Sequence, residues 1–309
     1  MLDLTFLTEE QVLGDNQLDI LKKYGTKCAI TDFAILLGGY VSPFHTDEGN
    51  SRKDRTGLWW TSAWNEGNLA WSINTAGIMR YNDLCERRVG FRPALSYSLI
   101  PSIMLNRKRC INGIDEIEYG EYPQWIVDDD YSEVLEEIFN KGNLKTTGKG
   151  YTTDTVCTWD VHYFDAHYNP RCFIEYIYDE NKYIRFLGDT NGIGKVLSNG
   201  KNFQINKPYW IKVEPITWLV DEKADIVLSK YIILTGIQFD DKKSRKSDFK
   251  ETFIKQYMDE YLSKEIECSV YKEKLIENKQ VDIDQLFEET IKRMSEINEM
   301  EKPKTKILK

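Results

Sequence analysis

The spacing of apolar residues predicts short helices at the start of the chain. Thr8, which precedes two glutamates, is typical of a capped helix start. Apolar residues at 18–24 ahead of Gly25 predict a second helix that ends at the glycine. A third helix is expected to begin at Thr31 or the next residue and to end at Gly38.

After residue 40 the pattern changes to short runs of β-branched and aromatic residues separated by turn formers. Such runs are typical of antiparallel strands joined by tight turns. The turns include 65–68 and 179–182, and Pro123 places an edge or a bend inside one run. The predicted strands are 58–62, 69–73, 91–95, 117–127, 173–178, 183–187, 210–214, 217–220 and 226–228.

Two stretches between the strand runs have another character. The aspartates at 128–130 precede apolar residues at helical spacing, which predicts a capped helix through Phe139. Residues 141–155 are rich in Gly and Thr and poor in apolar groups, so they are predicted to form a mobile loop.

The chain becomes charged and helical from about residue 241. One apolar stripe lies at 249–262 and is expected to dock on the sheet. A second stripe follows a polar spacer, and two interpretations stay open for it: another docked helix, or a helix that binds a protein partner. The predicted partner-binding residues are Leu286, Phe287, Ile291 and Met294.

Together these elements predict an α+β fold of loop-rich antiparallel sheets with short helices and a helical C-terminal tail. The 309 residues allow two domains or one large domain with an appendage. We expect a first α+β domain at 1–108, a second mixed domain at 109–245 and a helical segment at 246–309. The hydrophobic fraction of 41% excludes global disorder.

The net charge of −9 opposes non-specific binding to nucleic acid but permits a protein partner with a basic surface. Neither a secretory signal nor an apolar stretch long enough to span a membrane is visible, so a cytoplasmic protein is expected, or a virion component. The six cysteines show no metal-binding spacing, and buried thiols are the expected state. No metal or cofactor is predicted.

The densest group of potential acid–base residues is Asp160, His162, Asp165 and His167. Neither a strand nor a helix brings both histidines to one face, so His162, Asp165 and His167 are weak catalytic candidates. The run from Gly188 to Lys195 lacks the spacing of a phosphate loop, and turn formation explains it.

Aromatic and basic residues in the first part of the chain give a candidate ligand site. Trp59, Trp60 and Trp64 could line a surface that binds sugar or peptide, although such tryptophans also form cores. Arg92 either contacts the ligand or holds a loop by bidentate hydrogen bonds.

Two sets of motifs resemble known families. The segment 57–62, followed by Gly77 and by 90–95 with its Arg92-Pro93 pair, resembles the closing half of C-type-lectin-like domains related to the formylglycine-generating (sulfatase-modifying) group. The segments 117–124, 210–218 and 228–233 are similar to a bacterial and phage domain of unknown function that often accompanies that closing half. Here the Arg-Pro segment precedes the second set instead of following it.

The resemblance implies a scaffold that displays variable loops for binding. It does not carry over catalysis, because oxygen-activating members use a cysteine pair near their closing strands and only Cys85 lies near that position. The leading hypothesis is a non-catalytic bacterial or phage protein that engages a protein partner. One form of it is an intracellular mobile-element inhibitor of a nucleic-acid-handling host defence protein. The alternatives are an enzyme that modifies a peptide or small molecule, and a virion or surface adhesin that binds glycan.

Overall fold

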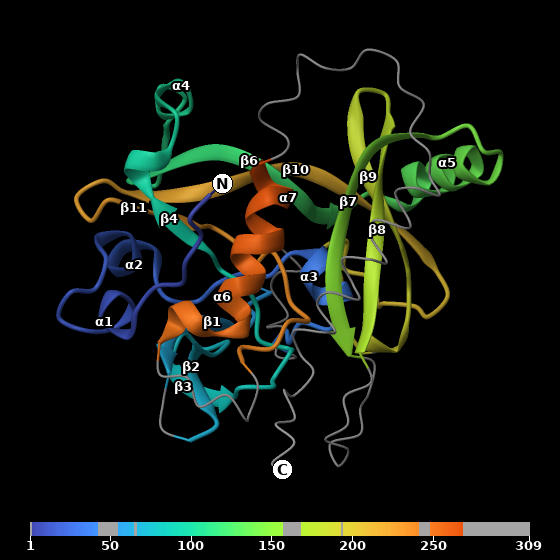
Figure 1. The fold of residues 1–309 in the computed structure, drawn as a ribbon. Coiled ribbons are helices and arrows are strands. Elements are labelled where there is room, and N and C mark those ends of the chain that lie inside the picture. The colour runs from blue at the N-terminus through green and yellow to red at the C-terminus, as the bar shows by residue number, and fades with distance from the viewer. Residues whose placement is uncertain are drawn as a thin grey trace, which may run out of the picture.

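The computed structural model describes residues 2–42, 55–64, 67–156, 168–192, 194–240 and 248–267, without the side chains of 103, 154–156 and 168–171. In this part of the chain the fold is α+β, with antiparallel sheets and short helices (Figure 1). The predicted fold class is confirmed at this level, and the C-type-lectin type stays a prediction.

The helices and strands follow the chain in this order. The α-helices are α1 (Glu9–Val12), α2 (Asp19–Tyr24), α3 (Asp32–Leu36), α4 (Ser102–Leu105), α5 (Asp129–Asn140), α6 (Phe253–Tyr257) and α7 (Ser263–Glu267). The turn of π-helix η4 (Met258–Leu262) joins α6 to α7, and 3-10 turns lie at η1 (Tyr97–Leu99), η2 (Thr190–Gly192) and η3 (Phe249–Glu251). The strands are β1 (Trp59–Trp64), β2 (Leu69–Ile73), β3 (Met79–Asp83), β4 (Ala94–Ser96), β5 (Arg109–Ile111), β6 (Ile114–Ile126), β7 (Lys145–Val156), β8 (Tyr168–Tyr178), β9 (Asn181–Leu187), β10 (Pro208–Asp221) and β11 (Ile226–Ser229).

The strands form a small and a large sheet. The small sheet has the order β1-β2-β3. The large one has the path β4-β11-β10-β9-β8-β7, and β6 pairs with both β10 and β5. The long strand β10 therefore has β6 along one edge and two successive partners, β9 and then β11, along the other.

One hydrophobic core holds the described residues together. It contains side chains from Leu2 to Ile266, so the described parts of the predicted segments 1–108, 109–245 and 246–309 share a single core. A second, smaller cluster lies under α5, where Leu135 packs with Tyr183 and Trp210. The amphipathic helix α5 thus covers the sheet face opposite to the main core.

Side-chain caps explain where the predicted helices begin. Thr8 and Gln11 form a reciprocal capping box at the start of α1. The hydroxyl of Thr31 accepts a hydrogen bond from Ala34 at the start of α3, and Asp128 does the same for Tyr131 at the start of α5. These three helix starts are confirmed.

The carboxylate of Asp32 joins four parts of the chain inside the core. Both Asp32 and its ion-pair partner Arg55 are almost fully buried, and their N–O distance is 2.8 Å. Asp32 also accepts hydrogen bonds from the backbone N–H groups of Ile126, at 3.1 Å, and Ser198, at 2.8 Å, and from the Ser198 hydroxyl. Helix α3, the end of β6 and the turn at Ser198 are therefore fixed to one buried charge.

The prediction of a mobile loop at 141–155 is wrong, because residues 145–156 form β7. This strand ends the path of the large sheet, and the C-terminal helices cover its outer edge. At Thr152 the backbone N–H donates to Glu265 at 2.9 Å, and the carbonyl accepts from the Tyr257 hydroxyl at 2.7 Å. These contacts satisfy edge groups that the alternation of small polar residues did not reveal.

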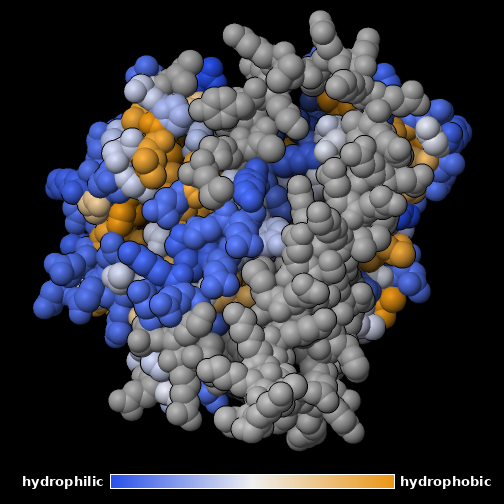
Figure 2. Space-filling view, in the orientation of Figure 1, coloured by the Kyte–Doolittle hydropathy of each residue, from blue (hydrophilic) through white to orange (hydrophobic). Residues whose placement is uncertain are grey.

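The surface that carries α6 and α7 is mostly hydrophilic in its described part, and a small apolar patch lies near β4 (Figure 2). Among the described residues, no helix is long and apolar enough to cross a membrane.

Helix α7 should make Gly120 irreplaceable. Gly120 has φ +66°, and a Cβ there would lie 2.3 Å from Cγ2 of Ile266. We expect Gly120→Ala to lower the free energy of unfolding by about 2–4 kcal/mol, through backbone strain and overpacking. Gly142, with φ +70° and open space around it, is the matched control. Gly142→Ala should cost about 1 kcal/mol in the same urea titration, and equal losses would contradict the packing of α7.

The buried ion pair should be costly to break. We expect Asp32→Asn to lower the free energy of unfolding by about 3–5 kcal/mol, because Arg55 is left buried without its counter-charge. Arg55→Met in the Asp32→Asn background should restore part of that loss, which a double-mutant cycle in urea measures. Glu137→Gln removes an exposed pair on α5 and should leave the midpoint unchanged. Additive single losses would show that Asp32 and Arg55 do not interact.

Candidate functional site

A pocket of about 460 Å³ opens over β6 and β10. Lys212 and Glu214 line it, and by strand alternation they share a face of β10 with Trp210, which packs under α5. Ile211 and Val213 point to the other face, into the main core. The pocket therefore lies on the α5 side of the large sheet, on regular strands and not on loops.

Two prolines disturb the pairing of β6 with β10 at this point. Pro123 lies opposite Val213, and Pro215 lies opposite Glu121, with register shifts beside both pairs. Proline has no N–H for the ladder, so a bulge at such positions is expected. The first shift leaves Gln124 as the extra residue between paired neighbours.

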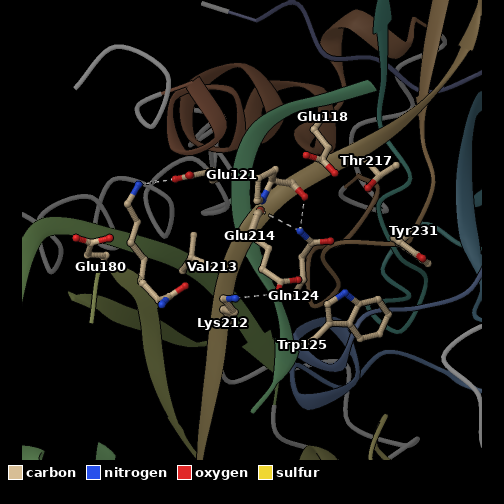
Figure 3. Close-up of a pocket in the computed structure, with 13 residues that line it drawn as sticks. Glu118, Glu121, Gln124, Trp125, Glu180, Lys212, Val213, Glu214, Thr217 and Tyr231 are labelled. Atoms are coloured by element: carbon tan, nitrogen blue, oxygen red, sulfur yellow. Dashed lines mark hydrogen bonds and ion pairs between the residues drawn. The ribbon is translucent and has the colours of Figure 1, made fainter. Parts of the chain in front are cut away.

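The side chain of Gln124 replaces the lost ladder bonds. Its Nε2 donates to the carbonyl of Glu214 at 2.9 Å and to that of Pro215 at 3.0 Å. Gln124 is only 2% exposed, so these bonds satisfy β10 carbonyls that burial would otherwise leave without a donor. The bulge and its glutamine form the floor of the pocket (Figure 3).

The ends of the pocket follow from the change of partner along β10. Pairing with β9 ends at Val213, opposite Lys182, and pairing with β11 begins at Trp218, opposite Ser229. Between these points one edge of β10 has no strand partner. The β8–β9 turn closes one end of the gap, and Tyr231, after β11, closes the other.

The lining is rich in acidic groups, with four carboxylates and two ammonium groups. Lys182 lies 2.6 Å from Glu121, and Arg109 contacts Glu118. Lys212 lies 3.7 Å from Glu214, which is too long for a hydrogen bond. Figure 3 places Glu214 near Gln124 and Trp125, and Glu121 and Glu180 toward the other end. Glu214 is thus the carboxylate with a weakly held partner at the glutamine end.

Two aromatic rings form the wall beside Gln124. The rings of Trp125 and Tyr231 are perpendicular, with centroids 5.2 Å apart. Each ring has a cation close to it: Arg55 lies 5.8 Å from the centre of Trp125, and Lys230 lies 6.0 Å from that of Tyr231. This wall therefore attracts positive charge as well as apolar groups.

The structure places most of the predicted ligand-binding residues in the core instead. Trp59, Trp60 and Arg92 are 0% exposed, so no ligand reaches them in this structure. The Arg92 guanidinium lies 4.9 Å from the ring centre of Trp59, and its Nε donates to the Ser229 carbonyl at 3.0 Å. The core interpretation of these residues is the one the burial supports, and the predicted bidentate bonds of Arg92 are not formed, since its two terminal nitrogens have no acceptor among the described residues.

Trp64 differs from its neighbours. It lies at the end of β1 and packs against the core while staying partly exposed. It lines no part of the pocket over β6 and β10.

The other predicted site residues lie outside the described residues. They are the catalytic candidates His162, Asp165 and His167 and the partner-binding residues Leu286, Phe287, Ile291 and Met294. Their predicted roles stay predictions.

The cysteines of the described ranges are free thiols, as the sequence predicts. They are Cys28, Cys85, Cys110 and Cys172. Burial raises the pKa of the Cys28 thiol to about 11, so it stays protonated at neutral pH. Within the residues that the structure describes, no group of three or more His, Cys, Asp and Glu side chains could hold a metal ion.

The segment 188–195 forms turns around η2, in agreement with its interpretation as a turn region. Lys195 is partly buried, and its ammonium group donates to the carbonyl of Gly39. Desolvation by burial lowers the pKa of Lys195 to about 7, and the nearby Arg88 lowers it further in the same direction. This lysine has a structural role in joining two loops.

Comparison with known proteins gives no relatives: no family model, no curated protein and no solved structure matches the chain. The four residues that define the pocket, namely Glu118, Glu121, Gln124 and Glu214, are therefore assigned from the geometry alone. The sequence analysis missed them, because carboxylates are common along the chain. The prolines at 123 and 215, each within a run that otherwise predicts a strand, were the only local signal.

Lys195 should make stability depend on pH in a defined direction. Its folded-state pKa of about 7 lies below that of an exposed lysine, so the unfolded chain binds more protons between the two values. The free energy of unfolding should therefore rise with pH from about 7 to about 10, and Lys195→Met should reduce that rise. Urea titrations at about pH 6.5 and about pH 9 measure the effect. Lys223→Met, at an 89% exposed side chain, is the control, and an unchanged slope in Lys195→Met would contradict the burial of its charge.

Proposed function

We propose that this protein is a non-catalytic binding protein that engages a protein partner through the pocket over β6 and β10. The partner presents a basic surface. The observation that carries the proposal is the lining of the pocket, in which four carboxylates outnumber two ammonium groups. The net charge of −9 adds a long-range attraction for such a partner.

The exposure of the carboxylates suits binding. The Glu118, Glu121 and Glu214 side chains are 48%, 27% and 31% exposed, so a partner can reach them without unfolding the strands. Their ion pairs are partly solvated and therefore weak, which lets a partner's cations compete for the carboxylates at small cost.

The same charge pattern supports a more specific form of the proposal. A protein that handles nucleic acid has a cationic groove for phosphates, and an acidic protein surface can occupy such a groove in their place. An intracellular mobile-element inhibitor of a host defence protein would act in this way. The acidic pocket favours this form over an adhesin that binds neutral glycan.

The test is capture of the partner with matched variants. A tagged protein is incubated with host lysate, with and without nuclease, and the bound proteins are identified by mass spectrometry. We expect one stoichiometric partner that survives nuclease treatment. The double variant Glu121→Gln/Glu214→Gln should reduce its capture about tenfold, because two lining charges are lost.

The control is Glu133→Gln/Glu137→Gln, which removes the same charge from the exposed face of α5. Capture by the control should equal that by the wild type. Equal capture by the pocket variant and the wild type contradicts the proposal, and so does turnover of a substrate by the purified protein that needs the pocket carboxylates.

A further inference from the structure

The buried carboxamide of Gln124 has one satisfied side and one open side. Its nitrogen is held by two β10 carbonyls, which also fixes the orientation of the amide. The oxygen accepts no hydrogen bond from the described residues, and the residue lines the pocket although it is only 2% exposed. In Figure 3 this oxygen points away from the two carbonyls, into the space beside Trp125.

A buried acceptor without a donor is costly, so the open side of Gln124 calls for a ligand with N–H or O–H groups. The neighbouring carboxylate has the same requirement. Glu214 lies 3.7 Å from Lys212 and makes no other ion pair with the described residues. An anionic ligand is excluded at this end by the charge of Glu214 and of Glu118.

We infer that the Gln124 end of the pocket receives an arginine side chain of the protein partner. This inference rests on the proposed function. A guanidinium has five N–H donors in one plane, so it can donate to the Glu214 carboxylate along one edge and to the Gln124 oxygen from another. An ammonium group is a compact point charge and matches this spread of acceptors less well.

The aromatic wall agrees with the same ligand. A planar guanidinium packs against aromatic rings better than an ammonium group does. The perpendicular rings of Trp125 and Tyr231 offer such a surface, and both already have a cation near them on another side. Arginine side chains are also common anchors at protein interfaces, where they fill pockets on the partner.

Three blocked peptides test the inference: acetyl-Gly-Arg-Gly-amide, its lysine analogue and its citrulline analogue. Citrulline keeps the shape of arginine and removes its charge. Binding is followed by fluorine NMR of the full chain labelled with 5-fluorotryptophan, and Trp125→Phe identifies the Trp125 signal. We expect the arginine peptide to shift that signal saturably, with affinity at least about fivefold above that of lysine, and the citrulline peptide to leave it unchanged.

Variants locate the contact. Glu214→Gln should weaken the arginine peptide by about tenfold, and Gln124→Met should weaken it as well. Glu133→Gln, on α5, should have no effect. Because Gln124→Met removes the bonds that hold the bulge, the partly exposed Glu214 provides the decisive variant.

The outcomes separate this inference from the proposed function. Equal binding of the three peptides, or full binding to Glu214→Gln, overturns the arginine site. If partner capture depends on Glu121 and Glu214 while the arginine peptide does not bind, the inference fails and the proposed function stands. If the arginine peptide binds at Glu214 but capture is insensitive to both carboxylates, the proposed function fails instead.

Discussion

The buried carboxylate of Asp32 is the contact on which the position of β6 depends. It balances the charge of Arg55 inside the core and accepts the N–H of Ile126, the last residue of β6. The adjacent Trp125 lines the pocket, and Arg55 lies beside its ring. A single buried charge therefore connects the core to the wall of the candidate site. Buried ion pairs contribute little net stability, and their best-attested effect is to specify one arrangement over others.

The second constraint is the mismatch between β6 and β10. Regular pairing would turn alternate side chains of both strands to the two faces and leave no hollow. Prolines at 123 and 215 prevent regular pairing, Gln124 fills the resulting gap, and Gly120 provides a second irregularity, on which α7 packs. The pocket is thus a consequence of strand geometry. The carboxylates around it have fixed positions because their backbones belong to a sheet that the core holds on its other face.

Local elements were predictable from the sequence because local interactions determine them. Thr8, Thr31 and Asp128 cap helices that begin where the sequence places them, and the turn at Asp179 and Glu180 has the positive φ angles of a tight hairpin. Strand β7 was missed because its core contacts depend on the fold: Tyr151 packs on Tyr122 of β6, and Thr152 bonds to the C-terminal helices. The pocket was missed for the same reason. Its acidic residues, at 118, 121, 180 and 214, are brought together only by the register of β6, β9 and β10.

The central claim is that β6 and β10 form the surface that a protein partner contacts. Hydrogen–deuterium exchange of the full chain, alone and in complex with a captured partner, tests it most directly. The account predicts slower exchange in residues 117–125 and 212–217 in the complex, together with the β8–β9 turn that closes one end of the pocket. Unchanged exchange in these segments, with protection confined to another part of the chain, would contradict it.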